Sequence, residues 1–146
     1  MTKRFVDNDE ALRHNAPPMA ERPPKPTGAE LNILHVLWAH GPQSVRDVQH
    51  ELNRTKATGY TSVLKTMQIM LEKGLVDRDD SVRPQVYRAR VSQERTQKQF
   101  LSEVVNQVYG GSFSALVMHA AGNHKLTPDD VAAIETLLDQ LKKGRK

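Results

Sequence analysis

Polar side chains of the kinds that bind nucleic acid lie at helical spacing between positions 58 and 68. They are Thr58, Thr61, Ser62, Lys65 and Gln68, and residues three or four positions apart share one side of a helix. A lysine can donate hydrogen bonds to guanine, a glutamine can pair with adenine, and a hydroxyl suits either a base or a phosphate. The pattern predicts that these side chains contact base edges in a DNA major groove. The simpler alternative is a solvated polar helix face.

Basic residues on both sides of this stretch suit a phosphate backbone. We expect phosphate contacts from Arg46, Lys56 and Arg83, because such contacts position a protein on DNA without specifying sequence. Weaker candidates are Arg54, Arg78 and Arg88. The alternative for each is an exposed charge that only keeps the protein soluble.

The histidines make a poor metal site. His119 and His124 lie five residues apart, as do His35 and His40, whereas two ligands on one helical face are spaced i, i+4. The chain has no cysteine, which excludes disulfides and thiolate metal sites. We therefore expect no metal and no other cofactor.

Catalytic motifs are not visible in the sequence. It has no glycine-rich phosphate loop and no recognisable nucleophile–base arrangement. Asp79-Asp80 precedes a predicted turn, and Asp129-Asp130 begins a predicted helix, where the helix dipole favours acids. The expectation is a binding protein and not an enzyme.

The elements that must position the polar residues begin after residue 26. Thr27 and Glu30 have the spacing of a capping box, and apolar residues at helical spacing follow it. Gly41-Pro42 should end this first helix near His40. The segment before it, residues 1–26, is rich in proline and poor in apolar residues, so we expect a disordered arm.

Two further helices and a hairpin are predicted next. Ser44 is expected to cap a short second helix, and Thr58 to cap a third that runs to Lys73 and stops at Gly74. The apolar stripe of the third helix comprises Tyr60, Val63, Leu64, Met67, Met70 and Leu71. Residues 75–79 and 86–90 are predicted strands joined by a turn. Three helices followed by a hairpin are the order of a winged helix-turn-helix domain, expected at 27–91.

The remainder, 92–146, is predicted to be a helical dimerisation domain. Its helices are broken at Gly110-Gly111 and restart at Thr127-Pro128. They are too amphipathic to remain alone in water, so a second copy is expected to cover their apolar side. The predicted dimerisation residues are Phe100, Leu101, Val104, Val105, Val108, Tyr109, Phe113, Leu116, Ile134, Leu137, Leu138 and Leu141. The predicted fold class is therefore mainly α with a small β-hairpin.

Composition agrees with this class of protein. The chain has 146 residues and a net charge of +4, and the basic excess falls mainly in the middle of the sequence. No apolar run reaches the roughly 20 residues of a membrane span. We expect a cytoplasmic protein that binds a polyanion.

Four segments together form a pattern that is more specific than any one of them. They are PTGAELNILHVLW at 26–38, YTSVLKTMQIMLEKGLV at 60–76, VYRARVS at 86–92 and FLSEVVNQVYGGSFSALV at 100–117. In order and spacing the chain resembles the penicillinase-repressor family, from residue 26 to about residue 141. Residues 1–25 have no counterpart in that pattern.

The resemblance implies a homodimer that binds a palindromic double-stranded DNA operator and represses a neighbouring operon until an inducing signal releases it. It places Thr61, Ser62 and Lys65 at DNA-contacting positions of the recognition helix. Many members have arginine where this chain has Ile69, so a contact is expected to be missing there. Copper-responsive members carry a C-terminal cysteine-rich metal site, which a chain without cysteine does not match.

In several members a membrane sensor-protease pathway leads to cleavage of an Asn-Phe bond in the first dimerisation helix. This chain has Gln99-Phe100 at the comparable place. Phe100 also belongs to the predicted apolar stripe, so a plain core role is the preferred interpretation.

Two other interpretations stay open. The chain could be a ligand-responsive winged-helix regulator of another family, or a winged-helix module that binds protein. The second would show exposed apolar positions on the third helix, which here is mainly threonine, serine, lysine and glutamine.

Overall fold

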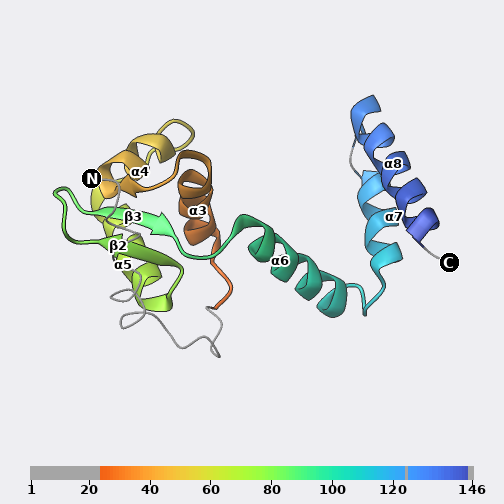
Figure 1. The fold of residues 1–146 in the computed structure, drawn as a ribbon, viewed down its shortest axis with the longest axis horizontal. Helices are drawn as coiled ribbons and strands as arrows, with labels where there is room; N and C mark the ends of the chain where they lie inside the picture. Colours follow the sequence, from red (N-terminus) through yellow and green to blue (C-terminus); the bar gives the residue numbers. More distant parts are fainter. Residues whose placement is uncertain (1–23, 124, 145–146) are drawn as a thin grey trace. The chain divides into compact units, whose positions relative to one another are not determined.

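The structure is a computed structural model that describes residues 24–123 and 125–144 (Figure 1). Its elements are α3 (Gly28–His40), β1 (Gln43–Ser44), α4 (Val45–Leu52), α5 (Tyr60–Lys73), β2 (Val76–Asp79), β3 (Val86–Ala89), α6 (Gln93–Gln107), α7 (Phe113–Asn123) and α8 (Pro128–Gly144). The predicted fold class is confirmed: the protein is mainly helical with a small antiparallel sheet, a winged helix followed by a helical region.

Helix α3 begins at the predicted capping box. The Thr27 hydroxyl accepts from the Glu30 backbone N–H at 3.2 Å, and Glu30 Oε1 accepts from the Thr27 N–H at 3.0 Å. Gly41 ends the helix with φ at 80°, a conformation that glycine adopts without a Cβ clash. Helix α4 begins at Ser44, whose hydroxyl accepts from the Asp47 N–H at 3.1 Å.

The start of α5 differs from the prediction. Its N-cap is Gly59, which makes no side-chain capping bond, so the expectation that Thr58 caps this helix was wrong. The Thr58 N–H donates to Asn53 Oδ1 at 2.6 Å, and its hydroxyl donates to the Lys56 carbonyl at 2.8 Å. Thr58 is therefore held in the turn before the helix. At the other end Gly74 adopts the predicted left-handed conformation, with φ at 83°.

Strands β2 and β3 form the predicted hairpin, and β3 pairs on its other side with β1, which the sequence did not indicate. The sheet order is β1-β3-β2, with both pairings antiparallel. Tyr87 lies between Gln43 of β1 and Arg78 of β2. A strand of two residues has no alternation to detect, so only its partner strand reveals it.

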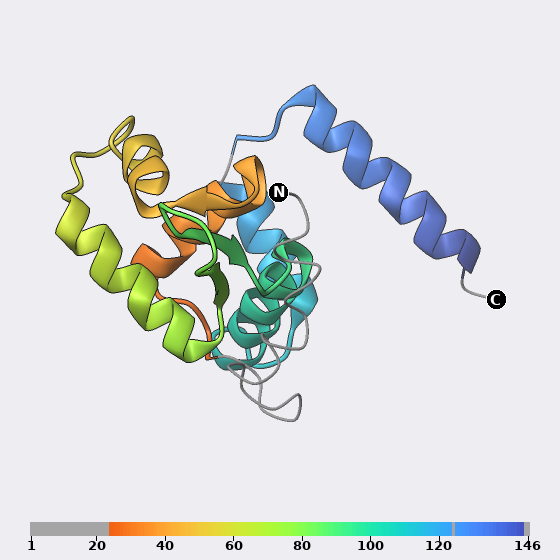
Figure 2. The same ribbon diagram turned by 60° about the vertical axis from the view of Figure 1, so that its left-hand side comes forward.

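Helices α3, α4 and α5 pack against one another and against the small sheet (Figure 2), and one hydrophobic core holds these elements together. It contains Ile33, Leu34, Leu37, Val45, Val48, Val63, Met67, Met70, Leu75, Val76 and Tyr87. Full burial of a side chain such as Val, Leu or Met stabilises a fold by roughly 1.5–3 kcal/mol. Since α5 contributes three side chains to this core, one side of the helix is anchored and the opposite side faces outward.

The later helices begin and end as their sequence signals predict. Gly110 and Gly111, with φ at 59° and 89°, separate α6 from α7. Thr127 and Asp130 form a capping box at the start of α8, with backbone-to-side-chain distances of 3.0 and 3.1 Å. Pro128 is the first helical residue, where its missing N–H costs nothing.

The chain divides into two compact units at Phe100–Leu101, inside α6. The domain boundaries proposed from the sequence stay predictions. Residues 1–23 of the predicted arm lie outside the described residues. The end of the arm packs on the first unit, because Pro26 is buried and the Lys25 ammonium nitrogen lies 5.1 Å from the Phe100 ring centroid.

Candidate nucleic-acid interface

Helix α5 has one buried side and one exposed polar side. The buried side carries Val63, Met67 and Met70, which are 2%, 0% and 0% exposed. The predicted base-contacting residues Thr61, Ser62, Lys65 and Gln68 are all exposed. The helix therefore presents hydrogen-bonding groups from its first turn onward, which is the part of a recognition helix that meets base edges.

Two large apolar side chains also lie on the exposed part of α5. Tyr60 and Ile69 are each 37% exposed. The Arg46 guanidinium carbon lies 4.7 Å from the Tyr60 ring centroid, a cation–π contact. This contact joins the first turn of α4 to the first turn of α5 and places a predicted phosphate-binding residue beside the predicted recognition helix.

The turn between α4 and α5 is held by side chains that the sequence analysis did not single out. Asn53 Oδ1 accepts from the Thr58 N–H, and Gln49 Nε2 donates to the Thr58 carbonyl at 3.1 Å. The turn thereby brings Thr58 and exposed Lys56 to the start of α5. An Asn or Gln beside a turn is the local signal that could have identified them.

A hollow of about 500 Å³ lies between the start of α4, the start of α5 and the wing. Arg46 and Tyr60 line it on the helical side, and Gln85 and Tyr87 line it on the wing side. The three elements expected to surround a DNA backbone thus meet at one concave surface.

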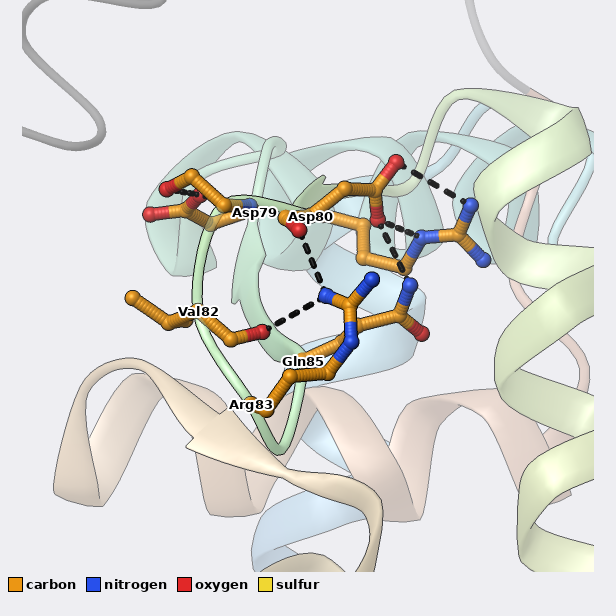
Figure 3. A network of polar contacts seen from close by, with 7 residues as sticks. Asp79, Asp80, Val82, Arg83 and Gln85 are labelled. Carbon is orange, nitrogen blue, oxygen red and sulfur yellow. Dashed lines mark hydrogen bonds and ion pairs between the residues drawn. The ribbon is translucent and has the colours of Figure 1, made fainter.

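The wing is the hairpin β2–β3 with its connecting turn, residues 76–89, and Asp80 organises the turn (Figure 3). Arg78 Nε donates to Asp80 Oδ1 at 2.5 Å and Arg78 Nη2 to Oδ2 at 3.3 Å, while Gln85 Nε2 donates to Oδ1 at 3.1 Å. The hydrogen bond from Arg78 to Asp80 is the main cause that raises the pKa of Arg78 above its usual value.

The predicted wing-tip residue, Arg83, is exposed but folded back on the turn. Its Nη1 donates to the carbonyls of Asp80 and Val82 at 2.6 and 3.0 Å (Figure 3). A phosphate contact would compete with these two hydrogen bonds, and the assignment of Arg83 stays a prediction.

A buried ion pair fixes the far end of α5. Lys73 Nζ lies 2.7 Å from Glu30 Oε2, and the Glu30 side chain is only 4% exposed. Burial alone would raise the pKa of Glu30, but hydrogen bonds from Lys73 and Thr27 and the charge of Lys73 outweigh it. The pKa of Glu30 therefore lies below its usual 4.5.

The second unit leaves many of its apolar side chains exposed. Neither α7 nor α8 has a buried residue within the described part of the chain. Of the predicted dimerisation residues, the exposed ones are Leu101, Val104, Val108, Phe113, Ile134, Leu137, Leu138 and Leu141. Phe100, Val105, Tyr109 and Leu116 are half-buried.

The bond between Gln99 and Phe100 lies in the interior of α6, and both residues are half-buried. A protease would reach it only after local unfolding of the helix. Cleavage of the bond between Gln99 and Phe100 therefore stays a prediction.

His35, His40 and His119 each contact another side chain. Tyr109 Oη and His119 Nδ1 are 3.1 Å apart, His40 Nε2 lies 3.5 Å from Glu51 Oε1, and the His35 ring meets Trp38 edge-on at 5.4 Å. His124 lies outside the described residues. Among the residues that are described, no group of three or more His, Cys, Asp or Glu is arranged to hold a metal ion.

In the described ranges no helix is both long and apolar enough to cross a lipid bilayer.

Three packed helices, the third with a polar exposed side, and an antiparallel wing define a winged helix-turn-helix protein. The penicillinase repressor family model matches residues 26–140, and the chain belongs to this family. It is 20% identical over 123 residues to the penicillinase repressor of Bacillus licheniformis, which covers 84% of this chain and 96% of that protein. The protein is thus a DNA-binding transcriptional repressor, from a family whose members are generally not enzymes.

Proposed function

We propose that the protein represses transcription as a homodimer on a palindromic operator, with α5 of each copy in a major groove. The observation that carries this proposal is the exposed polar side of α5 opposite its three buried side chains. Thr61, Ser62, Lys65 and Gln68 would contact base edges, and Thr58 would do so from the preceding turn. Arg46, Lys56 and Arg83 would bind phosphates on either side.

A second copy of the chain is the partner that best accounts for the exposed apolar residues of α6 to α8. Leu137 and Leu141 of α8 are 52% and 56% exposed, and Phe113 of α7 is 57% exposed. A monomer with this much apolar helix surface in water would lose the stabilisation that packing normally supplies. Two-fold pairing covers the same surface on both copies and sets two recognition helices at a fixed spacing.

In vitro selection of duplex DNA from a random library tests this proposal. The expected result is an enriched sequence with two inverted half-sites, whose centres lie about one helical turn or a multiple of it apart. Sedimentation of the protein with the selected duplex should give two copies per duplex. Enrichment of a single, non-repeated half-site bound by one copy would contradict it.

We propose that an inducing signal releases the protein from its operator. A membrane sensor-protease pathway that cuts at Gln99-Phe100 is one route, and the helical state of that bond argues for slow cleavage without a dedicated protease. Incubation of the purified protein with lysate of induced host cells, followed by mapping of the fragments, tests this route. A cut at 99–100 would support it, whereas an intact chain under inducing conditions would reject it.

Two alternatives differ in what the exposed surface would bind. A small ligand seated in the hollow between α4, α5 and the wing would occupy the DNA-binding surface itself, as in a ligand-responsive regulator. Exposed Tyr60 and Ile69 are the observations on α5 that favour a protein partner. Failure to select any duplex from the random library would favour the protein-binding alternative. Selection of a duplex that a small ligand then displaces would favour the ligand-responsive one.

A further inference from the structure

The wing carries equal numbers of acidic and basic side chains. Within residues 76–89 the acids are Asp77, Asp79 and Asp80, and the bases are Arg78, Arg83 and Arg88. A surface that binds a polyanion normally carries a basic excess. The charge balance of the wing is therefore unexpected in a protein that binds DNA.

The carboxylate of Asp80 makes contacts that a DNA phosphate could make. It accepts two hydrogen bonds from Arg78 and one from Gln85. Arginine and glutamine are among the side chains that donate to phosphate oxygens, and arginine forms the same paired arrangement with carboxylate and with phosphate. Asp80 thus occupies the anion position between these two donors.

The neighbouring acid, Asp79, has a different role. Asp79 is 0% exposed, and its Oδ1 accepts from the Ser81 N–H at 2.9 Å and the Ser81 hydroxyl at 2.5 Å. These bonds belong to the turn itself. Arg83 donates to the backbone carbonyl of Asp80 and not to its carboxylate. The Asp80 charge can therefore be removed while the bonds of Asp79 and Arg83 remain.

The pair between Asp80 and Arg78 is accessible to DNA. The two side chains are 57% and 26% exposed, and ion pairs exposed to water are weak. A phosphate that approaches the wing must displace the carboxylate and also meets its negative charge. Either effect lowers the affinity for DNA regardless of its sequence.

We propose that Asp80 is a positioning residue. By binding Arg78 and Gln85, it withholds them from DNA phosphates and so limits the sequence-independent part of the affinity for DNA. This inference rests on the proposed DNA-binding function. Base contacts by α5 are then needed for tight binding, because the wing adds few phosphate contacts of its own.

Fluorescence anisotropy with a short duplex of random sequence, over a series of salt concentrations, tests this role of Asp80. We expect Asp80→Asn to bind about two- to fivefold tighter than the unsubstituted protein, the range for loss of an exposed ion pair. The plot of log affinity against log salt should become steeper by about 0.9, the value for one more phosphate contact. A merely structural role in the turn would not steepen this slope. Asp80→Ser should give the same result.

Three comparisons separate the inference from simpler explanations. In an Arg78→Gln background, Asp80→Asn should have a much smaller effect, because the withheld arginine is gone. Glu94→Gln, which removes the same charge from an exposed pair with Lys98 on α6, should leave the slope unchanged. Thermal unfolding verifies that each variant is folded.

An unchanged or shallower slope for both Asp80 variants would overturn the inference, as would an equal effect of Asp80→Asn with and without Arg78. In these cases the unsubstituted protein still binds duplex DNA, so the proposed function stands. Absence of any duplex binding by the unsubstituted protein would overturn both.

Discussion

Lys73 Nζ lies 2.7 Å from Glu30 Oε2, so the last residue of α5 is tied to the capping box that begins α3. Glu30 accepts from the Thr27 N–H through its other oxygen. One buried carboxylate thus both caps α3 and holds the end of the proposed recognition helix.

Replacement of Glu30 by glutamine is expected to lower the free energy of unfolding by about 1–3 kcal/mol at neutral pH. This is less than the roughly 3–5 kcal/mol lost when a fully buried ion pair is broken, because the Lys73 side chain is 30% exposed. Folding lowers the pKa of Glu30, so its contribution is present above the usual pKa of 4.5 and is lost as the pH falls through the folded-state value. Urea unfolding at neutral pH and at about pH 3 measures this. The gap between the two proteins should shrink in acid, and an undiminished gap would contradict the assignment.

Lys65→Ala is expected to weaken binding to the duplex selected by the unsubstituted protein by about 1–3 kcal/mol, the range for one lost base contact. Binding to random-sequence duplex should weaken much less. Anisotropy titrations with the two duplexes measure the difference, and Lys98→Ala on α6 is the matched control. Equal losses on both duplexes would show that Lys65 binds phosphate.

Asn53→Ala removes the acceptor for the Thr58 N–H. We expect the free energy of unfolding to fall by about 0.5–1.5 kcal/mol, and affinity for the selected duplex to fall as well, because the start of α5 is then less well placed. Asn32→Ala, at an exposed site of α3, controls for the loss of a surface amide. Undiminished DNA affinity in Asn53→Ala would mean that the turn does not position the helix.

Arg83→Ala is expected to weaken binding to the selected and random duplexes equally and to make the salt slope shallower by about 0.9. The reason is that a phosphate contact carries no sequence information. Titration of both duplexes across a salt series checks this. Loss confined to the selected duplex would mean that the wing contacts bases.

Leu137→Glu and Thr136→Glu introduce the same charge at adjacent positions of α8. Leu137 shares the apolar stripe with Ile134, Leu138 and Leu141, whereas Thr136 lies on the other side of the helix. Sedimentation equilibrium should show a monomer for Leu137→Glu and a dimer for Thr136→Glu. A dimer in both cases would place the interface elsewhere.

Signals between near neighbours in the sequence were enough to predict most elements. The capping boxes at Thr27 and Thr127 and the glycines at 74, 110 and 111 mark helix ends through hydrogen bonds and backbone conformations that involve only a few residues. The apolar stripe of α5 likewise predicted its buried side, and with it the exposed polar side. The capping role assigned to Thr58 failed because the helix begins one residue later, after Gly59, while bonds to Asn53 and Lys56 hold Thr58 in the turn.

Contacts between residues distant in the sequence were determined only by the tertiary structure. Glu30 and Lys73 are 43 residues apart, Arg46 meets Tyr60 across a turn, and β1 exists only through its pairing with β3. Such contacts depend on how the elements pack, and periodicity carries no information about that. The sequence alone therefore determined the polar outward side of α5, although Tyr60, which was expected in the apolar stripe, is 37% exposed. The packing determined which charges from distant parts of the sequence are engaged with each other, as Glu30 and Lys73 are.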